Sequence, residues 1–65
     1  MQQTFRTRAG VKIGYNLRRG AFIVGYLTNG SRVGYYCPRL DVTYLPNGSR
    51  VGYGNLLGAL IFENA

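Results

Sequence analysis

The chain has 65 residues, which is room for one domain and too few for a second core. It contains one cysteine, no histidine and two acidic residues, a composition that excludes an internal disulfide and a metal cage of the usual ligands. The formal net charge of +6 at pH 7 favours anionic partners such as nucleic acid or another polyanion, and it also keeps the chain soluble.

The N-terminal residues 1–6 have no apolar run behind their charges, so no signal peptide is expected there. Phe5 is interpreted as the remnant of a strand that begins the series, which would bring the sheet to about seven strands. The longest apolar run, residues 56–62, is far shorter than the roughly 20 residues that a membrane span requires. Because the chain has a lone thiol and no export signal, the expected location is the cytoplasm.

An internal repeat is the strongest signal in the sequence. Residues 26–35 (YLTNGSRVGY) recur as residues 44–53 (YLPNGSRVGY), with Thr28 and Pro46 as the only difference, and residues 10–15 (GVKIGY) are a looser copy. The shared pattern is Gly, any residue, Lys or Arg, Val or Ile, Gly, Tyr. Repetition at a short spacing determines the architecture, and it predicts one domain, 1–65, with units at approximately 10–28, 29–46 and 47–64.

Each unit is predicted to contain two strands, since short runs rich in Val, Ile, Tyr and Phe are bounded by turn residues. The first strands are expected at 11–16, 32–36 and 50–54, and the second strands at 21–27, 41–45 and 59–63. The Asn-Gly pairs at 29–30 and 47–48 predict type I′ hairpin turns, and no amphipathic helix of useful length is expected. The predicted fold class is all-β: an antiparallel meander of three repeated hairpins, about six to seven short strands, forming a partial barrel or flower that self-association completes.

The two-residue period of a strand predicts which face is the core. In each strand a branched aliphatic residue and then an aromatic one, such as Val33 and Tyr35, share a side, and this side is expected to be buried. The opposite side carries a glycine at the same place in each unit, at Gly14, Gly34 and Gly52. Glycine weakens a strand, so something is expected to approach closely there: a neighbouring sheet, another subunit or a tyrosine ring. An aspartate at Val33 or Val51 is accordingly expected to abolish folding.

The pattern Gly-x-[Lys/Arg]-[Val/Ile]-Gly-Tyr, used three times from Gly10 onward, resembles the bacterial families that are made of short hairpin repeats. The β-flower type is the nearer resemblance and MORN-repeat proteins are the more distant one. The resemblance implies a structural or binding role and offers no catalytic residues to carry over.

Catalysis is not predicted. Without histidine, a nucleophilic Cys37 would need Asp41, Glu63 or Lys12 as its base, and none of these is in a recognisable arrangement. Cys37 is instead interpreted as a surface residue in a loop between two strands. The chain is therefore expected to be no enzyme and to use no cofactor and no metal.

Basic residues form the candidate binding site. Equivalent repeat positions hold Lys12, Arg32 and Arg50, and the loops after the first strands hold Arg18, Arg19 and Arg39. In a regular sheet the first three would line up as a stripe, and the other three would gather at one end. Such a set is typical of a site for a phosphate backbone, and exposed tyrosines such as Tyr36 would add stacking on single-stranded bases.

The leading hypothesis is a small non-enzymatic structural or interaction module that forms a homo-oligomer, because chains of this size often need such help to be stable. The alternative is a basic nucleic-acid or polyanion-binding module. The hypotheses differ on the basic stripe, which is either the functional site or a by-product of a duplication that copied every residue of the unit.

Overall fold

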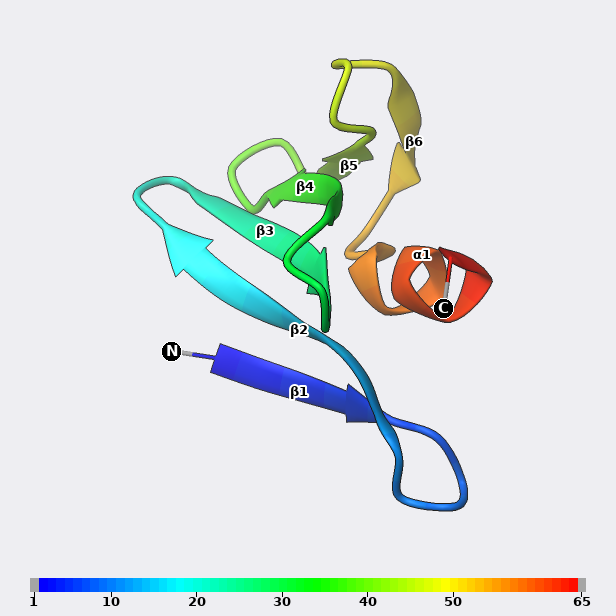
Figure 1. Ribbon diagram of the computed structural model, residues 1–65. Helices are drawn as coiled ribbons and strands as arrows, with labels where there is room; N and C mark the ends of the chain where they lie inside the picture. Colours follow the sequence, from blue (N-terminus) through cyan, green and yellow to red (C-terminus); the bar gives the residue numbers. More distant parts are fainter. Residues whose placement is uncertain (1, 65) are drawn as a thin grey trace.

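The computed structural model describes residues 2–64 and contains one twisted sheet and one short helix (Figure 1). The elements are β1 (Gln2–Arg6), β2 (Lys12–Arg19), β3 (Phe22–Leu27), β4 (Arg32–Cys37), β5 (Val42–Tyr44), β6 (Arg50–Tyr53) and α1 (Leu57–Asn64). Six strands lie side by side in chain order, each antiparallel to the next. The predicted all-β hairpin meander is confirmed, with the strand around Phe5 as β1. The sheet does not close, since within residues 2–64 the first and last strands each pair on one side only.

The hairpins β1–β2, β3–β4 and β5–β6 share one turn geometry. In β3–β4 the Gly30 amide donates to the Leu27 carbonyl (2.9 Å) and the Leu27 amide donates to the Ser31 carbonyl (2.8 Å). Gly30 has a φ of 90°, whereas Asn29 has no positive φ, so this is a type I turn followed by a left-handed glycine. The predicted hairpins are confirmed but the predicted type I′ geometry is wrong. The Asn29 side chain instead accepts a hydrogen bond from the Ser31 amide (2.9 Å).

Each of these three hairpins has a β-bulge at the same repeat position. In β3–β4, Arg32 pairs with Tyr26 and Gly34 pairs with Gly25, which leaves Val33 as the extra residue. Ile13 and Val51 are the extra residues of the other two hairpins. A bulge interrupts the alternation of side chains along a strand, so Val33 and Gly34 both face the same side of the sheet.

The core lies on the glycine side, so the predicted core face was wrong for the tyrosines, whereas Val33 is buried as predicted. Helix α1 packs across this side, and the buried cluster consists of Val33, Leu57, Leu60 and Ile61. A Cβ atom at Gly14 would lie 2.6 Å from Ile61 Cγ2, and one at Gly34 would lie 3.0 Å from Leu60 Cδ1. Gly14 and Gly34 therefore form part of a shallow trough that admits the helix.

Helix α1 replaces the strand predicted at 59–63. Its buried residues Leu57, Leu60 and Ile61 have the three- and four-residue spacing of one helix face. The Asn55 side chain accepts a hydrogen bond from the Leu57 amide (3.1 Å) and so caps the start of the helix. None of the helical structure among residues 2–64 has the length and apolar character needed to cross a membrane.

The Thr43 hydroxyl joins the sheet to the segment that leads into α1. Thr43 is fully buried, and its Oγ1 donates to the Gly54 carbonyl (2.6 Å) while it accepts from the Leu56 amide (3.0 Å). We expect Thr43→Val to lower the free energy of unfolding by about 1–3 kcal/mol, because two backbone groups lose their partner. Urea unfolding followed by circular dichroism measures this loss. Thr4→Val, on the exposed side of β1, is the control, and an equal loss in both variants would contradict the role of Thr43.

Candidate nucleic-acid interface

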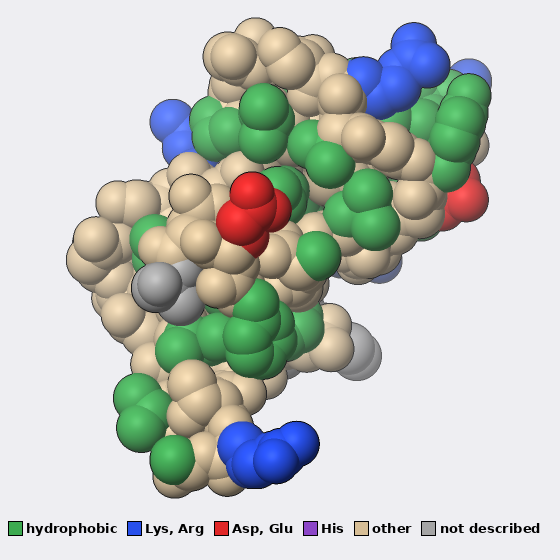
Figure 2. All heavy atoms as spheres, turned by 90° about the vertical axis from the view of Figure 1, so that its right-hand side faces the viewer, with side chains coloured by type: hydrophobic (Ala, Val, Ile, Leu, Met, Phe, Trp, Pro, Cys, Tyr) green, Lys and Arg blue, Asp and Glu red, His purple; other side chains and the backbone are tan. Residues whose placement is uncertain are grey.

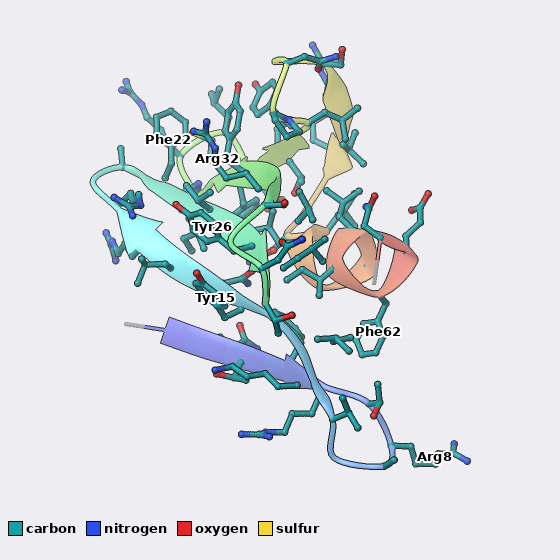
Figure 3. All side chains as sticks on the ribbon, viewed as in Figure 1. Arg8, Tyr15, Phe22, Tyr26, Arg32 and Phe62 are labelled. Carbon is teal, nitrogen blue, oxygen red and sulfur yellow. The ribbon has the colours of Figure 1, made fainter. Side chains whose placement is uncertain are left out.

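Aromatic side chains cover the side of the sheet opposite α1. Tyr15 stacks on Tyr26 with ring centroids 5.1 Å apart, and Tyr35 stacks on Tyr44 with centroids 5.2 Å apart. Phe22 meets Tyr35 edge to face at 5.5 Å. Figure 3 shows Tyr15 and Tyr26 side by side near the middle of the sheet. We call these five residues the tyrosine face.

The register of the sheet creates the tyrosine face. Tyr15 is the cross-strand partner of Tyr26, and Tyr35 is that of Tyr44. Aromatic cross-strand pairs stabilise a sheet by about 0.2–1 kcal/mol each. The four tyrosines are only half-buried and Phe22 is exposed, so the face stays accessible to a ligand.

Two arginines border a groove on this face. The Arg19 Nε donates to the Tyr26 hydroxyl (2.9 Å), and its guanidinium carbon lies 5.9 Å from the centre of that ring. Arg32 pairs with Tyr26 from the other side, across β3–β4. Both arginines line a hollow of about 330 Å³ with Phe22, Val24, Gly34 and Tyr35. Two cationic groups from different strands therefore flank an aromatic surface, and Figure 3 shows Phe22 and Arg32 close together.

Lys12, Arg32 and Arg50 lie on a diagonal rather than in a straight row across the sheet. Arg32 is the partner of Tyr26, which pairs with Tyr15, three positions after Lys12. In the same way, Arg50 is the partner of Tyr44, which pairs with Tyr35, three positions after Arg32. Neighbouring members of the diagonal are thus about 14 Å apart. Lys12 itself borders a separate hollow of about 290 Å³.

The remaining predicted basic residues lie elsewhere. Arg18 alternates with Arg19 and pairs with Ile23, a residue that packs against the core, so it belongs to the α1 side of the sheet. Arg39 is exposed in the loop between β4 and β5. Figure 2, which looks onto the right-hand side of Figure 1 with α1, shows basic side chains at the periphery and hydrophobic ones over the centre. Of the six predicted residues, the groove brings Arg19 and Arg32 together.

Tyr36 and Cys37 differ from their expected settings. Tyr36 packs against the core cluster, and its hydroxyl donates to Asp41 Oδ1 (2.6 Å). That hydrogen bond, with burial and the carboxylate charge adding to it, raises the pKa of the Tyr36 phenol. Cys37 is the last residue of β4, pairs with Val42 and is buried, so it is not a surface thiol in a loop. Within residues 2–64, no three Cys or acidic side chains gather as a metal site would require.

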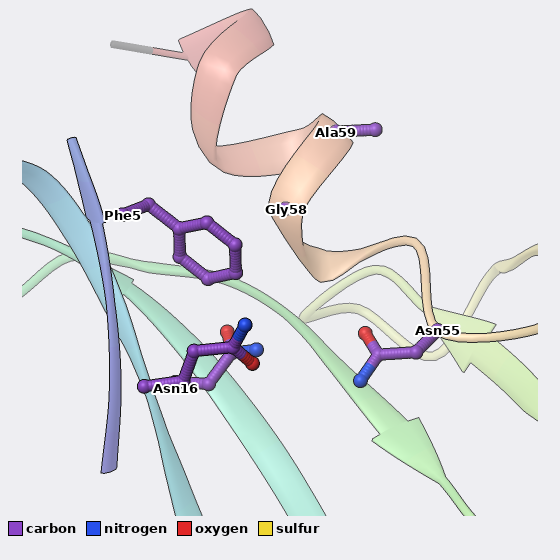
Figure 4. Close-up of a pocket in the computed structure, with 6 residues that line it drawn as sticks. Phe5, Asn16, Asn55, Gly58 and Ala59 are labelled. Atoms are coloured by element: carbon purple, nitrogen blue, oxygen red, sulfur yellow. The ribbon is translucent and has the colours of Figure 1, made fainter. Parts of the chain in front are cut away.

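A third hollow, of about 280 Å³, lies where β1 and β2 meet the start of α1 (Figure 4). Phe5, Gly58 and Ala59 line it with the amides of Gln3, Asn16 and Asn55. Asn16 is only 3% exposed, and its Oδ1 has no hydrogen-bond partner among the described residues. The cavity has room for ordered water, which would satisfy this oxygen.

Sequence reasoning missed the aromatic members of the groove because it assigned Tyr35 to the core and assigned Phe22 to neither face. The signal that could have identified them is the glycine at one repeat position on the opposite side of the sheet. A helix that packs on a sheet needs the space that glycine leaves, whereas stacked tyrosines do not.

A scan against protein-family models, a search of curated proteins and a search of solved structures each found no match. The resemblance to hairpin-repeat families accordingly rests on the repeated motif alone.

Proposed function

We propose that this chain is a small non-enzymatic interaction module whose tyrosine face binds polyanions, and single-stranded nucleic acid in particular. The observation that carries the proposal is the groove in which Arg19 and Arg32 flank Phe22 and Tyr35. Guanidinium groups bind phosphates, and aromatic rings stack on bases, at about 1–3 kcal/mol per base. The groove offers both kinds of contact on one open surface.

Single strands fit this surface better than a duplex does. Bases reach an aromatic ring only when they are unstacked from their neighbours, and a β-sheet that presents aromatic residues is a known way to hold them. The diagonal of Arg32, Arg50 and Lys12 gives each cation a different phosphate along an extended strand. The net charge of +6 adds long-range attraction.

The test is binding of a fluorescein-labelled oligothymidylate, measured by anisotropy at several salt concentrations. We expect wild-type affinity to fall steeply with salt, and Arg19→Ala combined with Arg32→Ala to weaken binding at least tenfold and to reduce the log–log salt slope by about 1.4. Phe22→Ala is expected to weaken binding with little change of the slope, since it removes a stacking partner and no charge.

Arg8→Ala combined with Arg18→Ala is the matched control, because it removes the same charge away from the groove. Equal weakening by both double variants would refute a site on the tyrosine face and leave only general charge attraction. Duplex DNA bound as tightly as the single strand would refute the stacking role.

Self-association is the second part of the proposal. The core cluster is small, and a chain of this size buries little apolar area, so contact between copies would add stability. The lone, buried thiol of Cys37 fits a reducing compartment, and the cytoplasm stays our proposed location.

A further inference from the structure

The outer edge of β6 exposes apolar residues that the other repeat units cover. Within residues 2–64, β6 pairs with β5 alone. Val51 is 39% exposed although its equivalent Val33 is 6% exposed, and Tyr53 is 73% exposed although its equivalent Tyr35 stacks on Tyr44. An open strand edge with exposed apolar side chains is suited to pairing with a further strand.

The repeat specifies what kind of strand is missing. In the two earlier units the motif strands are β2 and β4, and each pairs with the strand that follows it in the chain. The tyrosine of that following strand stacks on the motif tyrosine, as in Tyr15–Tyr26 and Tyr35–Tyr44. Up to residue 64 no such strand follows β6, because residues 57–64 form α1. Tyr53 pairs with Val42 on its inner side, so it is the one motif tyrosine whose partner on the outer side would come from outside the described chain.

Strand β1 matches the missing strand. In its turn the Thr7 amide donates to the Val11 carbonyl, as the Leu27 amide donates to the Ser31 carbonyl in β3–β4. Thr7 is therefore equivalent to Leu27, and the preceding residue Arg6 is equivalent to Tyr26. The outer edge of β1 is open, since β1 pairs only with β2 among residues 2–64. Because alternate strands of the meander point in opposite directions, β1 and β6 have the antiparallel relation that this pairing needs.

We propose that copies of this chain associate head to tail, with β6 of one copy pairing with β1 of the next and Tyr53 opposite Arg6 of the second copy. This inference rests on the self-association proposed above. The arginine would lie against the exposed tyrosine ring, a favourable cation–π contact. The contact joins two different edges, so it continues from copy to copy as an open chain or closes as a ring.

Cross-linking tests the pairing and its register. In a Cys37→Ala background, Tyr53→Cys and Arg6→Cys proteins are oxidised separately and as a mixture. We expect the mixture to give a disulfide-linked dimer and each protein alone to stay monomeric on a denaturing gel. Thr28→Cys mixed with Leu40→Cys, both in exposed loops, measures random collision. A linked dimer from either single protein, or a mixed yield no higher than that of the loop pair, would overturn the head-to-tail pairing.

Light scattering over a range of concentrations separates this proposal from the broader one. We expect the wild-type mass to rise with concentration, Tyr53→Lys to abolish the rise by placing a cation opposite Arg6, and a further Arg6→Glu change to restore it. A rise that persists in Tyr53→Lys would mean that copies associate elsewhere and would overturn only the β6–β1 pairing. A wild-type mass that stays monomeric throughout would overturn self-association as well. Oligonucleotide binding, measured on dilute protein, is independent of both results.

Discussion

An aspartate in place of Val33 is expected to unfold the chain, whereas the same change at Val51 is expected to leave it folded. Val33 is 6% exposed and packs with Leu57, Leu60 and Ile61, so a carboxylate there would be buried without a partner. The effective cost of such a charge is several kcal/mol, which is comparable to the whole stability of a domain this small, roughly 3–10 kcal/mol. Val51 is 39% exposed at the sheet edge, where water solvates the new charge.

Far-UV circular dichroism and proton–nitrogen NMR spectra of the two variants measure this difference. They are best recorded on dilute protein, because the exposed edge of β6 is the surface proposed to contact a second copy. An unfolded Val33→Asp chain and a folded Val51→Asp chain would show that the repeat motif alone does not determine whether its valine is buried. Contact with α1 and the neighbouring strands determines it instead. A folded Val33→Asp chain would contradict the position of the core.

Alanine at Gly14 or Gly34 is expected to have the next largest effect. A Cβ atom at either position would lie 2.5 Å from a backbone carbonyl oxygen, of Tyr26 or Tyr44, and close to a core side chain of α1. The carbonyl oxygen cannot yield without moving the strand, so we expect a loss of about 2–3 kcal/mol. For a domain of this size the melting temperature should fall by roughly 10–20 °C.

Gly52→Ala is the matched control, because Gly52 holds the same place in the third copy of the motif. Its Cβ would meet only Leu56 Cδ1, at 3.2 Å, and the end of a leucine side chain can rotate away. Thermal unfolding of the three alanine variants should therefore separate Gly14 and Gly34 from Gly52. Equal losses at all three positions would mean that close contacts with α1 and with the neighbouring carbonyl do not explain why glycine recurs.

The repeat was sufficient to predict the strands and hairpins but not the faces. Pairing between neighbours follows from local turns, and the Asn-Gly pairs marked two of these turns correctly. The faces were wrong because Ile13, Val33 and Val51 are bulge residues, and a bulge shifts the two-residue period that the prediction assumed.

Helix α1 was missed for a different reason. An apolar run as short as residues 56–62 fits either a strand or a helix, and what the run packs against decides between them. The cap at Asn55 and the spacing of Leu57, Leu60 and Ile61 were the available signals. The basic residues of the candidate site could be named from the sequence. The groove between Arg19 and Arg32 could not be predicted, because the tyrosines were assigned to the buried face of the sheet and lie on the open one.

The position of the core residues along the chain has a consequence for how the protein is made. Of the four residues in the buried cluster, Leu57, Leu60 and Ile61 belong to α1, the last element of the described chain. Hairpins form as soon as neighbouring strands are available, since their contacts are local. The trough stays empty until the end of α1 has left the ribosome, however, so the strands that emerge before α1 present an uncovered sheet until then. Stable folding therefore begins only when translation of this region is complete.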